Sequence, residues 1–420
     1  MSEGQKTSTD PLNQDPPIGI ILLRPIAPTL KITDWCGFKI AGVPLLLRNI
    51  LTVQGGGLKR ILLLDLTQSS LDETFRHRIL GDQRINIVVD WVSKTGDLEK
   101  LLNNGDPILL MEGSVLYNKE EIRSATQGNP PQSFESLDKR DLIKLLENPE
   151  TANAASISDI TKTRMGDIEA SNSLRVGLLT GRERSKINSK ADLISQHEQL
   201  LNTCGLNNDS FMDRLITRSI SRRLTRLFLD TPFSPNQITF FSLIIGLVSA
   251  GFFFQGTYLT GMIGAGLLLF SAWIDCTDGE IARLKFMESE LGSKLDLLSD
   301  NIVHFAVFFS IGMGLYYSTG QAVYKTLGAF AVLGSLISFV LLSTQIVEKK
   351  SMAGADSSVS TEKNFADKLA NRDFTYFLLL MALAGRLDIF IIITALGANA
   401  FALYLVYFKT RSSLSLTGNR

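Results

Sequence analysis

Four aspartates stand close together in the apolar second half of this chain. They form two pairs, Asp275 with Asp278 and Asp296 with Asp300. Spacings of three and four residues place both members of a pair on one face of a helix, so two such faces can meet at one point. Carboxylates about 4 Å apart repel by roughly 4 kcal/mol per pair at an effective dielectric constant near 20, so the cluster needs protons, basic partners or divalent cations. Ligands that are all oxygen atoms favour Mg²⁺ or Mn²⁺.

Two other interpretations of the aspartates start from the same residues. In the first, the aspartates are helix caps and partners in interfacial salt bridges. In the second, the aspartates belong to an ion pathway, since carboxylates within membranes also mark transporters. All four lie at one end of two apolar segments, whereas the ion sites of transporters usually lie near the midplane of the bilayer. This position favours a metal site.

The residues around the aspartates complete a longer pattern. The chain reads DCTDGEIAR from 275 to 283 and, after eight more residues, GSKLDLLSD from 292 to 300. This resembles the signature of the CDP-alcohol phosphatidyltransferase family, DxxDGxxAR followed by GxxxDxxxD. Every fixed position is filled: Asp275, Asp278, Gly279, Ala282, Arg283, Gly292, Asp296 and Asp300. The resemblance covers roughly residues 206–420, and it implies dependence on Mg²⁺ or Mn²⁺ and assembly as a homodimer.

The resemblance also implies a reaction. In the family, a second alcohol attacks a CDP-linked alcohol, commonly CDP-diacylglycerol, at the phosphorus distal to cytidine, and CMP leaves. By position, Asp275, Asp278 and Asp296 would bind one or two divalent ions around the pyrophosphate. Asp300 would complete the group of metal-binding aspartates and accept the proton of the attacking hydroxyl.

The other signature residues have roles that their chemistry suggests. Gly279, Ala282 and Gly292 let the backbone approach a nucleotide or a neighbouring helix closely. Arg283 either neutralises phosphate or braces a carboxylate.

Two further residues near the aspartates have more than one interpretation. Asn236 belongs to a Pro-Asn pair that the family commonly carries at the start of its first span, so it is a candidate for the nucleotide pocket; the alternative is a helix cap. His304 follows Asp300 by one helical turn, and we interpret it as a hydrogen-bonded structural histidine; the alternative is that it assists Asp300.

Six apolar segments are long enough, or nearly long enough, to span a membrane. We expect them at 237–255, 257–276, 296–317, 323–346, 374–385 with its flanks, and 387–408. Sixteen lysines and arginines lie near the segment ends on one side, against Lys325 and Arg386 on the other. The positive-inside rule therefore predicts an integral multi-pass protein of an inner or plasma membrane, with the N-terminal domain, the aspartates and the C-terminus in the cytoplasm.

Residues 206–232 are predicted to form an amphipathic juxtamembrane helix before residues 233–420, the membrane domain. Apolar residues recur there at helical spacing, and arginines follow one another at intervals of four, at Arg214, Arg218, Arg222 and Arg226. Such a helix is suited to an anionic membrane surface. The alternative is the solvated basic face of a soluble helix.

Residues 17–205 are expected to form a separate α/β domain, Rossmann-like in class, after a disordered tail at 1–16. That tail lacks the features of a signal peptide, so we expect this domain not to be exported. Apolar runs predict strands at 18–23, 60–65, 85–91 and 107–111, with a helix at 44–53. A Ser/Asn/Ala-rich stretch near 150–175 is expected to be a surface loop or an insertion.

Part of this domain resembles sugar-nucleotide and alcohol-phosphate nucleotidyltransferases, namely KIAGVPLLLR at 39–48 and KRILLL at 59–64. Its fusion to the membrane domain resembles the layout of the archaeal bifunctional inositol-phosphate cytidylyltransferase and di-inositol-phosphate phosphate synthase. However, LRPIAP at 23–28 provides no glycine-rich phosphate loop. Gly113-Ser114 stands where those enzymes carry a metal-binding Gly-Asp. We therefore predict a degenerate nucleotidyltransferase-like domain that binds, scaffolds or regulates.

The overall composition narrows the function classes. Formal net charge is zero, which gives no overall attraction to nucleic acid, and the three cysteines show neither metal-type spacing nor a disulfide framework. We predict a phosphotransferase of phospholipid biosynthesis whose donor is a CDP-linked alcohol such as CDP-diacylglycerol and whose acceptor is an alcohol. The alternatives are a synthase that makes a polar di-alcohol phosphodiester from a CDP-polyol such as CDP-inositol and, with less support, a carboxylate-based transporter.

Overall fold

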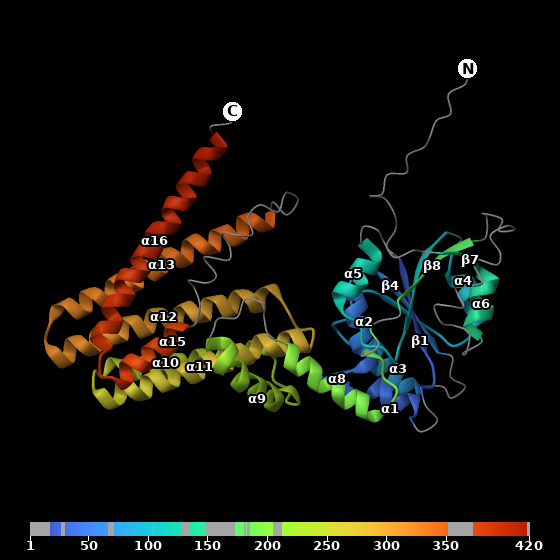
Figure 1. The fold of residues 1–420 in the computed structure, drawn as a ribbon, viewed down its shortest axis with the longest axis horizontal. Helices are drawn as coiled ribbons and strands as arrows, with labels where there is room; N and C mark the ends of the chain where they lie inside the picture. Colours follow the sequence, from blue (N-terminus) through green and yellow to red (C-terminus); the bar gives the residue numbers. More distant parts are fainter. Residues whose placement is uncertain are drawn as a thin grey trace, which may run out of the picture. The chain divides into compact units, whose positions relative to one another are not determined.

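The computed structural model describes ten stretches of the chain: residues 17–26, 30–65, 71–103, 105–127, 135–147, 173–179, 182, 185–204, 212–351 and 373–417. The predicted tail at 1–16 lies outside them. The chain divides into two compact units, Met1–Leu200 and Leu201–Arg420, which are blue to green and green to red in Figure 1. Each unit is described by itself.

The first unit contains a six-stranded sheet. Its strands are β1 (Ile18–Leu23), β4 (Arg60–Asp65), β5 (Val88–Val92), β6 (Pro107–Glu112), β7 (Glu135–Asp138) and β8 (Ser173–Leu179). They lie in the order β5-β4-β1-β6-β8-β7, and all neighbours are parallel except β7, which pairs antiparallel with β8. A separate two-stranded sheet joins β2 (Lys39–Ile40) to β3 (Val43–Pro44).

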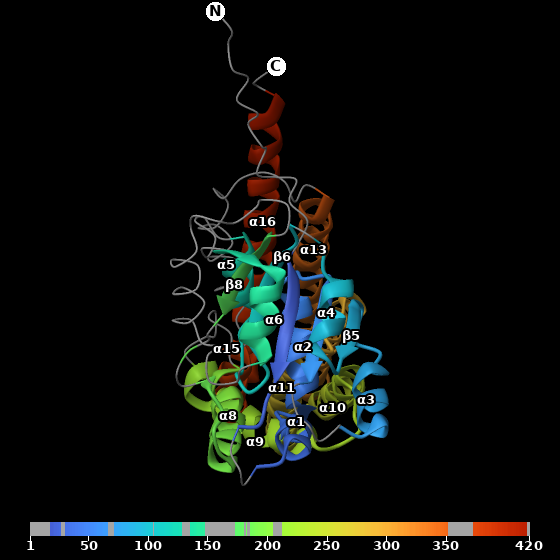
Figure 2. The same ribbon diagram turned by 90° about the vertical axis from the view of Figure 1, so that its right-hand side faces the viewer.

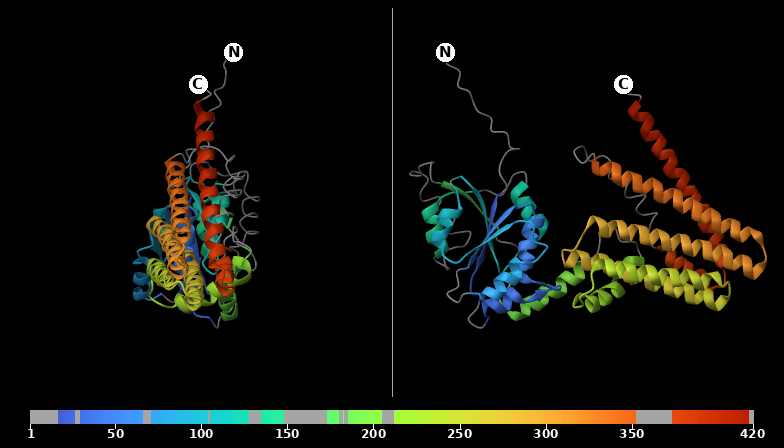
Figure 3. Two further views of the ribbon diagram at one scale, coloured as in Figure 1. Left: turned by 90° about the vertical axis from the view of Figure 1, so that its left-hand side faces the viewer. Right: turned by 180° about the vertical axis from the view of Figure 1, so that it is seen from behind.

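Helices cover both faces of the six-stranded sheet, as parallel strands require, because β1, β4 and β6 are apolar on both faces. Helices α4 (Thr95–Leu101) and α6 (Lys139–Glu147) lie on one face (Figure 2), and α2 (Leu45–Gly55) and α5 (Lys119–Gln127) on the other (Figures 1 and 3). Further helices that the structure describes are α1 (Ile32–Gly37), α3 (Glu73–Leu80) and α8 (Lys190–Thr203). The predicted α/β class is confirmed.

Some strands were predicted correctly and others were not. Strands were found at 18–23, 60–65 and 107–112, with β5 starting three residues later than expected. Strands β7 and β8 were not foreseen. Residues 173–175, which were expected to lie in a loop, begin β8, whereas 148–172 lie outside the described residues.

The described residues of the second unit fold into helices joined by short turns. Its helices are α9 (Arg218–Leu229), α10 (Pro235–Phe254), α11 (Tyr258–Leu284), α12 (Glu290–Thr319), α13 (Ala322–Ser351), α15 (Asp373–Leu383) and α16 (Leu387–Thr417). A π-helical turn, η2 (Asp213–Thr217), leads into α9. Helix α10 packs against α11 and α12, and α13 packs against α12 and α16; these helices are coloured yellow to red in Figure 3.

Five of the six predicted spans are helices long and apolar enough to cross a membrane. The fifth predicted segment, 374–385, forms the apolar helix α15 of 11 residues. This is shorter than the roughly 20 residues that cross a bilayer at 1.5 Å per residue. Helices α11 and α12 also extend past their predicted ends, to Leu284 and back to Glu290, so the whole signature except the connecting turn is helical.

Small residues allow the membrane helices to approach closely. Gly256 has φ +68°, and a Cβ there would overlap the carbonyl oxygen of Gly314. A Cβ on Gly312 would lie 2.8 Å from the Cα of Gly328. At both places the backbone of α12 lies directly against the backbone of another segment, and a side chain on the glycine would force the two apart.

Gly256→Ala is expected to destabilise the second unit. The left-handed backbone alone costs an alanine about 1–2 kcal/mol, and the overlap with Gly314 adds to this cost. Thermal unfolding of the detergent-solubilised chain measures the effect. Gly266→Ala is the matched control, because its Cβ would meet no atom within 4 Å; equal melting temperatures for both variants would contradict the expectation.

Candidate metal and nucleotide site

Three of the four predicted aspartates come together. Asp275 and Asp278 project from α11 and Asp296 from α12, and one carboxylate oxygen of each lies within 4.8 Å of the other two. Asp275 and Asp278 are each 5% exposed, and Asp296 is half-buried. We call these three side chains the aspartate group.

Hydroxyl groups on α10 hold the two buried carboxylates. Thr239 Oγ1 donates to Asp278 Oδ2, and Ser242 Oγ lies 3.4 Å from Asp275 Oδ1. Ser242 and Thr239 are themselves buried. Thr239 of the first span therefore positions one carboxylate of the second span, and Ser242, whose Oγ donates to the carbonyl oxygen of Thr239 at 2.7 Å, lies beside the other. The sequence did not identify either residue.

The start of α10 is fixed by its own sequence. Ser234 caps the helix and forms a reciprocal capping box with Gln237, and Pro235 occupies the first turn. Thr239 Oγ1 also lies 3.2 Å from the carbonyl oxygen of Pro235. Because these contacts fix the start of α10, they also fix the position of Thr239 along the helix axis, opposite Asp278.

The aspartate group fits a divalent cation of the Mg²⁺ or Mn²⁺ type. All of its donor atoms are carboxylate oxygens from two helices, which hard cations prefer. Three carboxylates this close together repel strongly unless a cation or protons compensate them. Asp300 is not a member of this group.

A cavity of about 170 Å³ opens beside Asp278 and Asp296. Its lining contains the other residues that the sequence proposed for nucleotide binding: Gly279, Ala282, Arg283 and Gly292 of the signature, and Asn236 of the Pro-Asn pair. The remaining lining residues come from the start of α10, from the turn between α11 and α12, and from the first turn of α12. We call this space the donor cavity.

Two glycines keep the donor cavity open. A Cβ on Gly292 would lie 3.0 Å from Asn236 Oδ1, so the missing side chain leaves room for Asn236. A Cβ on Gly279 would lie 3.3 Å from Arg283 Nη1. Asn236 is not the helix cap, since Ser234 has that role.

Arg283 is held by a contact that neither sequence interpretation included. Its Nη2 donates to the carbonyl oxygen of Cys204 at 3.3 Å. Burial, and to a lesser extent the nearby Glu280 carboxylate, raises the pKa of the Cys204 thiol to about 11. The thiol therefore stays protonated at neutral pH and does not compete with phosphate for Arg283.

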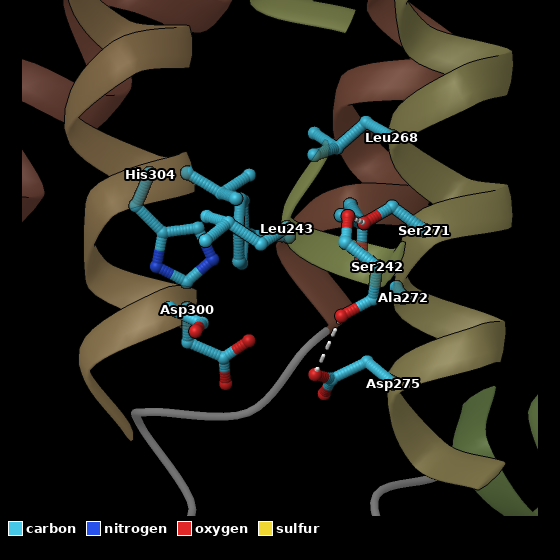
Figure 4. A pocket seen from close by; sticks show the side chains of 12 residues that line it. Ser242, Leu243, Leu268, Ser271, Ala272, Asp275, Asp300 and His304 are labelled. Carbon is cyan, nitrogen blue, oxygen red and sulfur yellow. Dashed lines mark hydrogen bonds between the residues drawn. The ribbon is translucent and has the colours of Figure 1, made fainter. Parts of the chain in front are cut away.

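A second cavity of about 90 Å³ is lined by Asp275, which does not line the donor cavity. Asp300 and His304 on α12 face Asp275 and Ser242 across it, as Figure 4 shows. The ring of His304 lies edge-on to Phe374 of α15 at a centroid distance of 4.9 Å. We call this space the acceptor cavity. His304, which was interpreted as structural, thus packs against Phe374 and also lines a cavity.

The juxtamembrane arginines do not all face outward. Arg223 and Arg226 are exposed, as an amphipathic helix predicts, but Arg218 is buried and pairs with Glu280 of α11 at 2.7 Å. Spacing alone does not distinguish an arginine on a lipid-facing stripe from one in a buried ion pair, so this part of the stripe prediction was wrong.

Comparison with known proteins agrees with the signature. Residues 233–410 match the model of the CDP-alcohol phosphatidyltransferase family, which confirms the predicted resemblance. The bifunctional IPC transferase and DIPP synthase of Archaeoglobus fulgidus is 28% identical over 219 residues, which are 52% of this chain and 42% of that protein. The protein of the same name from Aquifex aeolicus is 25% identical over 200 residues, 47% of this chain and 44% of that protein.

This chain therefore matches less than half the length of these curated relatives. Among solved structures, Mycobacterium tuberculosis phosphatidylinositol phosphate synthase with CDP-DAG bound is similar with a TM-score of 0.33 and 16% identity, over 45% of this chain and 92% of that chain.

Proposed function

We propose that this protein is an integral membrane CDP-alcohol phosphotransferase that uses a divalent cation and releases CMP. One observation carries the proposal: two separate helices bring Asp275, Asp278 and Asp296 within 4.8 Å of one another. The donor cavity beside them is lined by the signature residues that the family pattern assigns to the nucleotide. The match of residues 233–410 to the family supports the same reaction class.

The aspartate group would hold Mg²⁺ or Mn²⁺, which neutralises charge on the pyrophosphate and on the departing CMP when it is bound. Thr239 and Ser242 keep the Asp278 and Asp275 carboxylates directed into this site. Asn236 and Arg283 lie where a nucleotide would enter the donor cavity. Catalysis of this kind depends on positioning and charge stabilisation more than on covalent chemistry.

Asp300 is proposed to accept the proton of the attacking hydroxyl. It lines the acceptor cavity together with Asp275, so a hydroxyl bound there lies between a general base and the aspartate group. Ser242, Ser271 and Thr375 also line this cavity and offer hydrogen bonds to an alcohol. The acceptor is therefore expected to bind in the acceptor cavity, apart from the nucleotide in the donor cavity.

The names of the relatives support an alternative donor substrate. Both matched relatives named above are bifunctional IPC transferase and DIPP synthases, which supports a CDP-polyol such as CDP-inositol as the alternative to CDP-diacylglycerol. Incubating the purified chain with each donor and a panel of alcohols, and measuring CMP, decides between them. CMP release that requires CDP-diacylglycerol supports the lipid reaction, and release from CDP-inositol alone supports the phosphodiester reaction.

We further propose that the aspartate group faces the cytoplasm. The excess of lysine and arginine next to the membrane segments on the side of the aspartates supports this orientation. CDP-linked substrates are available on that side. Assembly as a homodimer is proposed from the family resemblance alone.

We propose that the α/β unit has a binding or scaffolding role and no nucleotidyltransferase activity. Asn49 Nδ2 fixes the turn after β6 by donating to the carbonyl oxygens of Gly113 and Val115 at 2.9 and 3.0 Å. Ser114 in this turn carries a hydroxyl in place of the aspartate that an active enzyme would use for metal. This turn follows β6, next to β1, where the strand order reverses and nucleotide sites of α/β folds usually lie.

The full-length chain is therefore expected to release no pyrophosphate from CTP and an alcohol phosphate such as inositol phosphate. The reason is that the turn after β6 provides no carboxylate for the cation that this reaction needs. A coupled pyrophosphate assay, calibrated with added pyrophosphate, measures this. Turnover above the background of a sample without the chain would overturn the proposal.

A further inference from the structure

Glu280 lies inside the signature but at a position that the signature leaves open, and it is fully buried. Its carboxylate accepts three hydrogen bonds. Arg218 Nη1 and Ser221 Oγ each donate to Oε1 at 2.7 Å, and Thr225 Oγ1 donates to Oε2 at 2.6 Å. A buried carboxylate with this many charge-assisted bonds is tightly fixed.

All three donors come from one face of α9. Arg218, Ser221 and Thr225 are spaced by three and four residues, and all three are buried. Leu224 and Phe228 of the same helix pack against a small core of Ile238, Ile274 and Ile281. Helix α9 is therefore bonded to α11 and packed against both α10 and α11.

A second anchor ties the start of α9 to α15 and α11. Thr217 Oγ1 and Tyr376 Oη are 2.8 Å apart, and Trp273 Nε1 donates to the same Tyr376 oxygen at 3.2 Å. These contacts lie about two helical turns from Glu280 along α11. Together they hold the part of α11 that carries Asp275 and Asp278.

Glu280 points away from the aspartate group. At about 100° per residue, Asp278 lies roughly 160° around α11 from Glu280, so the two side chains occupy opposite faces of the helix. One face of α11 is held by α9 while the other face presents the carboxylates. Rotation of α11 about its axis would break the Glu280 contacts and displace Asp278 at the same time.

We propose that Glu280 is a positioning residue: with Arg218, Ser221 and Thr225 it fixes the rotation of α11 so that Asp278 faces the donor cavity. This inference rests on the proposed function. It assigns α9 a role in the reaction that differs from attachment to the membrane surface. Only Arg218 of the arginines on α9 takes part.

The test uses the full-length chain with Glu280→Gln and Arg218→Gln, and with Arg223→Gln as the matched control because Arg223 is on the same helix and exposed. Mn²⁺ affinity is measured by electron paramagnetic resonance without substrate. Loss of a residue that orients metal ligands typically lowers metal affinity or activity about 10–100-fold, and we expect this range for both variants in Mn²⁺ affinity and in kcat/KM for the CDP-linked donor. Arg223→Gln is expected to match the wild type.

Thr225→Val and Ser221→Ala provide milder changes if Glu280→Gln does not fold, since each removes one hydrogen bond and leaves the ion pair. Each is expected to lower Mn²⁺ affinity several-fold and to lower the melting temperature modestly, because the buried carboxylate loses one donor. Wild-type Mn²⁺ affinity in all folded variants would overturn the inference. A wild-type chain that binds Mn²⁺ but releases no CMP would instead overturn the proposed function, and the effect of the variants on Mn²⁺ affinity could still be measured.

Discussion

Asp278→Asn is expected to reduce CMP release on the order of 10³-fold, because a bound cation supplies several kcal/mol of charge stabilisation and each 1.36 kcal/mol changes the rate tenfold. Asparagine keeps the shape of the side chain and can still accept the hydrogen bond from Thr239. It removes one of three negative charges from the aspartate group. The rate of CMP release and the affinity for Mn²⁺ are measured on the same preparation.

Asp230→Asn is the matched control for this variant. Asp230 is exposed at the end of α9 and does not line the donor or the acceptor cavity. It is expected to leave both the rate and the Mn²⁺ affinity unchanged. A folded Asp278→Asn protein with wild-type Mn²⁺ affinity would show that the aspartate group is not the metal site.

Asp300→Asn is expected to produce a different defect. Removal of a general base typically lowers the rate about 10²–10⁴-fold, so kcat should fall within this range. The KM for the CDP-linked donor and the Mn²⁺ affinity should change little, because Asp300 lies in the acceptor cavity and outside the aspartate group. Steady-state kinetics and Mn²⁺ binding separate these effects.

The sequence predicted Asp300 both as a fourth metal ligand and as the base, and this variant distinguishes the two roles. Asp296→Asn is the comparison, because Asp296 lies on the same helix one turn away and belongs to the aspartate group. Equal losses of Mn²⁺ affinity in the two variants would make Asp300 a ligand. An unchanged kcat in Asp300→Asn would exclude it as the base.

Much of the site was predictable because its residues share short, regular spacings. The pairs at three and four residues placed the aspartates on helix faces, and the glycine and alanine positions lie around the donor cavity as the signature implies. Thr239, Ser242 and Glu280 were not predictable in the same way. Their importance depends on which way α9 and α10 face α11, and no local pattern in the sequence specifies the rotation of packed helices.

The fold also has features that the sequence predicted and features that it did not. Strands β1, β4 and β6 are continuous apolar runs and were identified, whereas β7 reads ESLD and forms only through its pairing with β8. Strand β8 follows a polar stretch that obscured its start. The ion pair between Arg218 and Glu280 joins residues 62 apart in the chain, and periodicity within one helix cannot reveal a contact of this kind.

The most direct test of the central claim is the cation dependence of CMP release by the purified full-length protein. The chain is first stripped with a chelator, then supplied with CDP-diacylglycerol or CDP-inositol, a panel of alcohols, and Mg²⁺ or Mn²⁺. We predict that at least one combination releases CMP only after the cation is added, and that a second addition of chelator stops the reaction. CMP release that continues at the same rate in the stripped protein, or no release from a folded protein that binds Mn²⁺, would contradict the account.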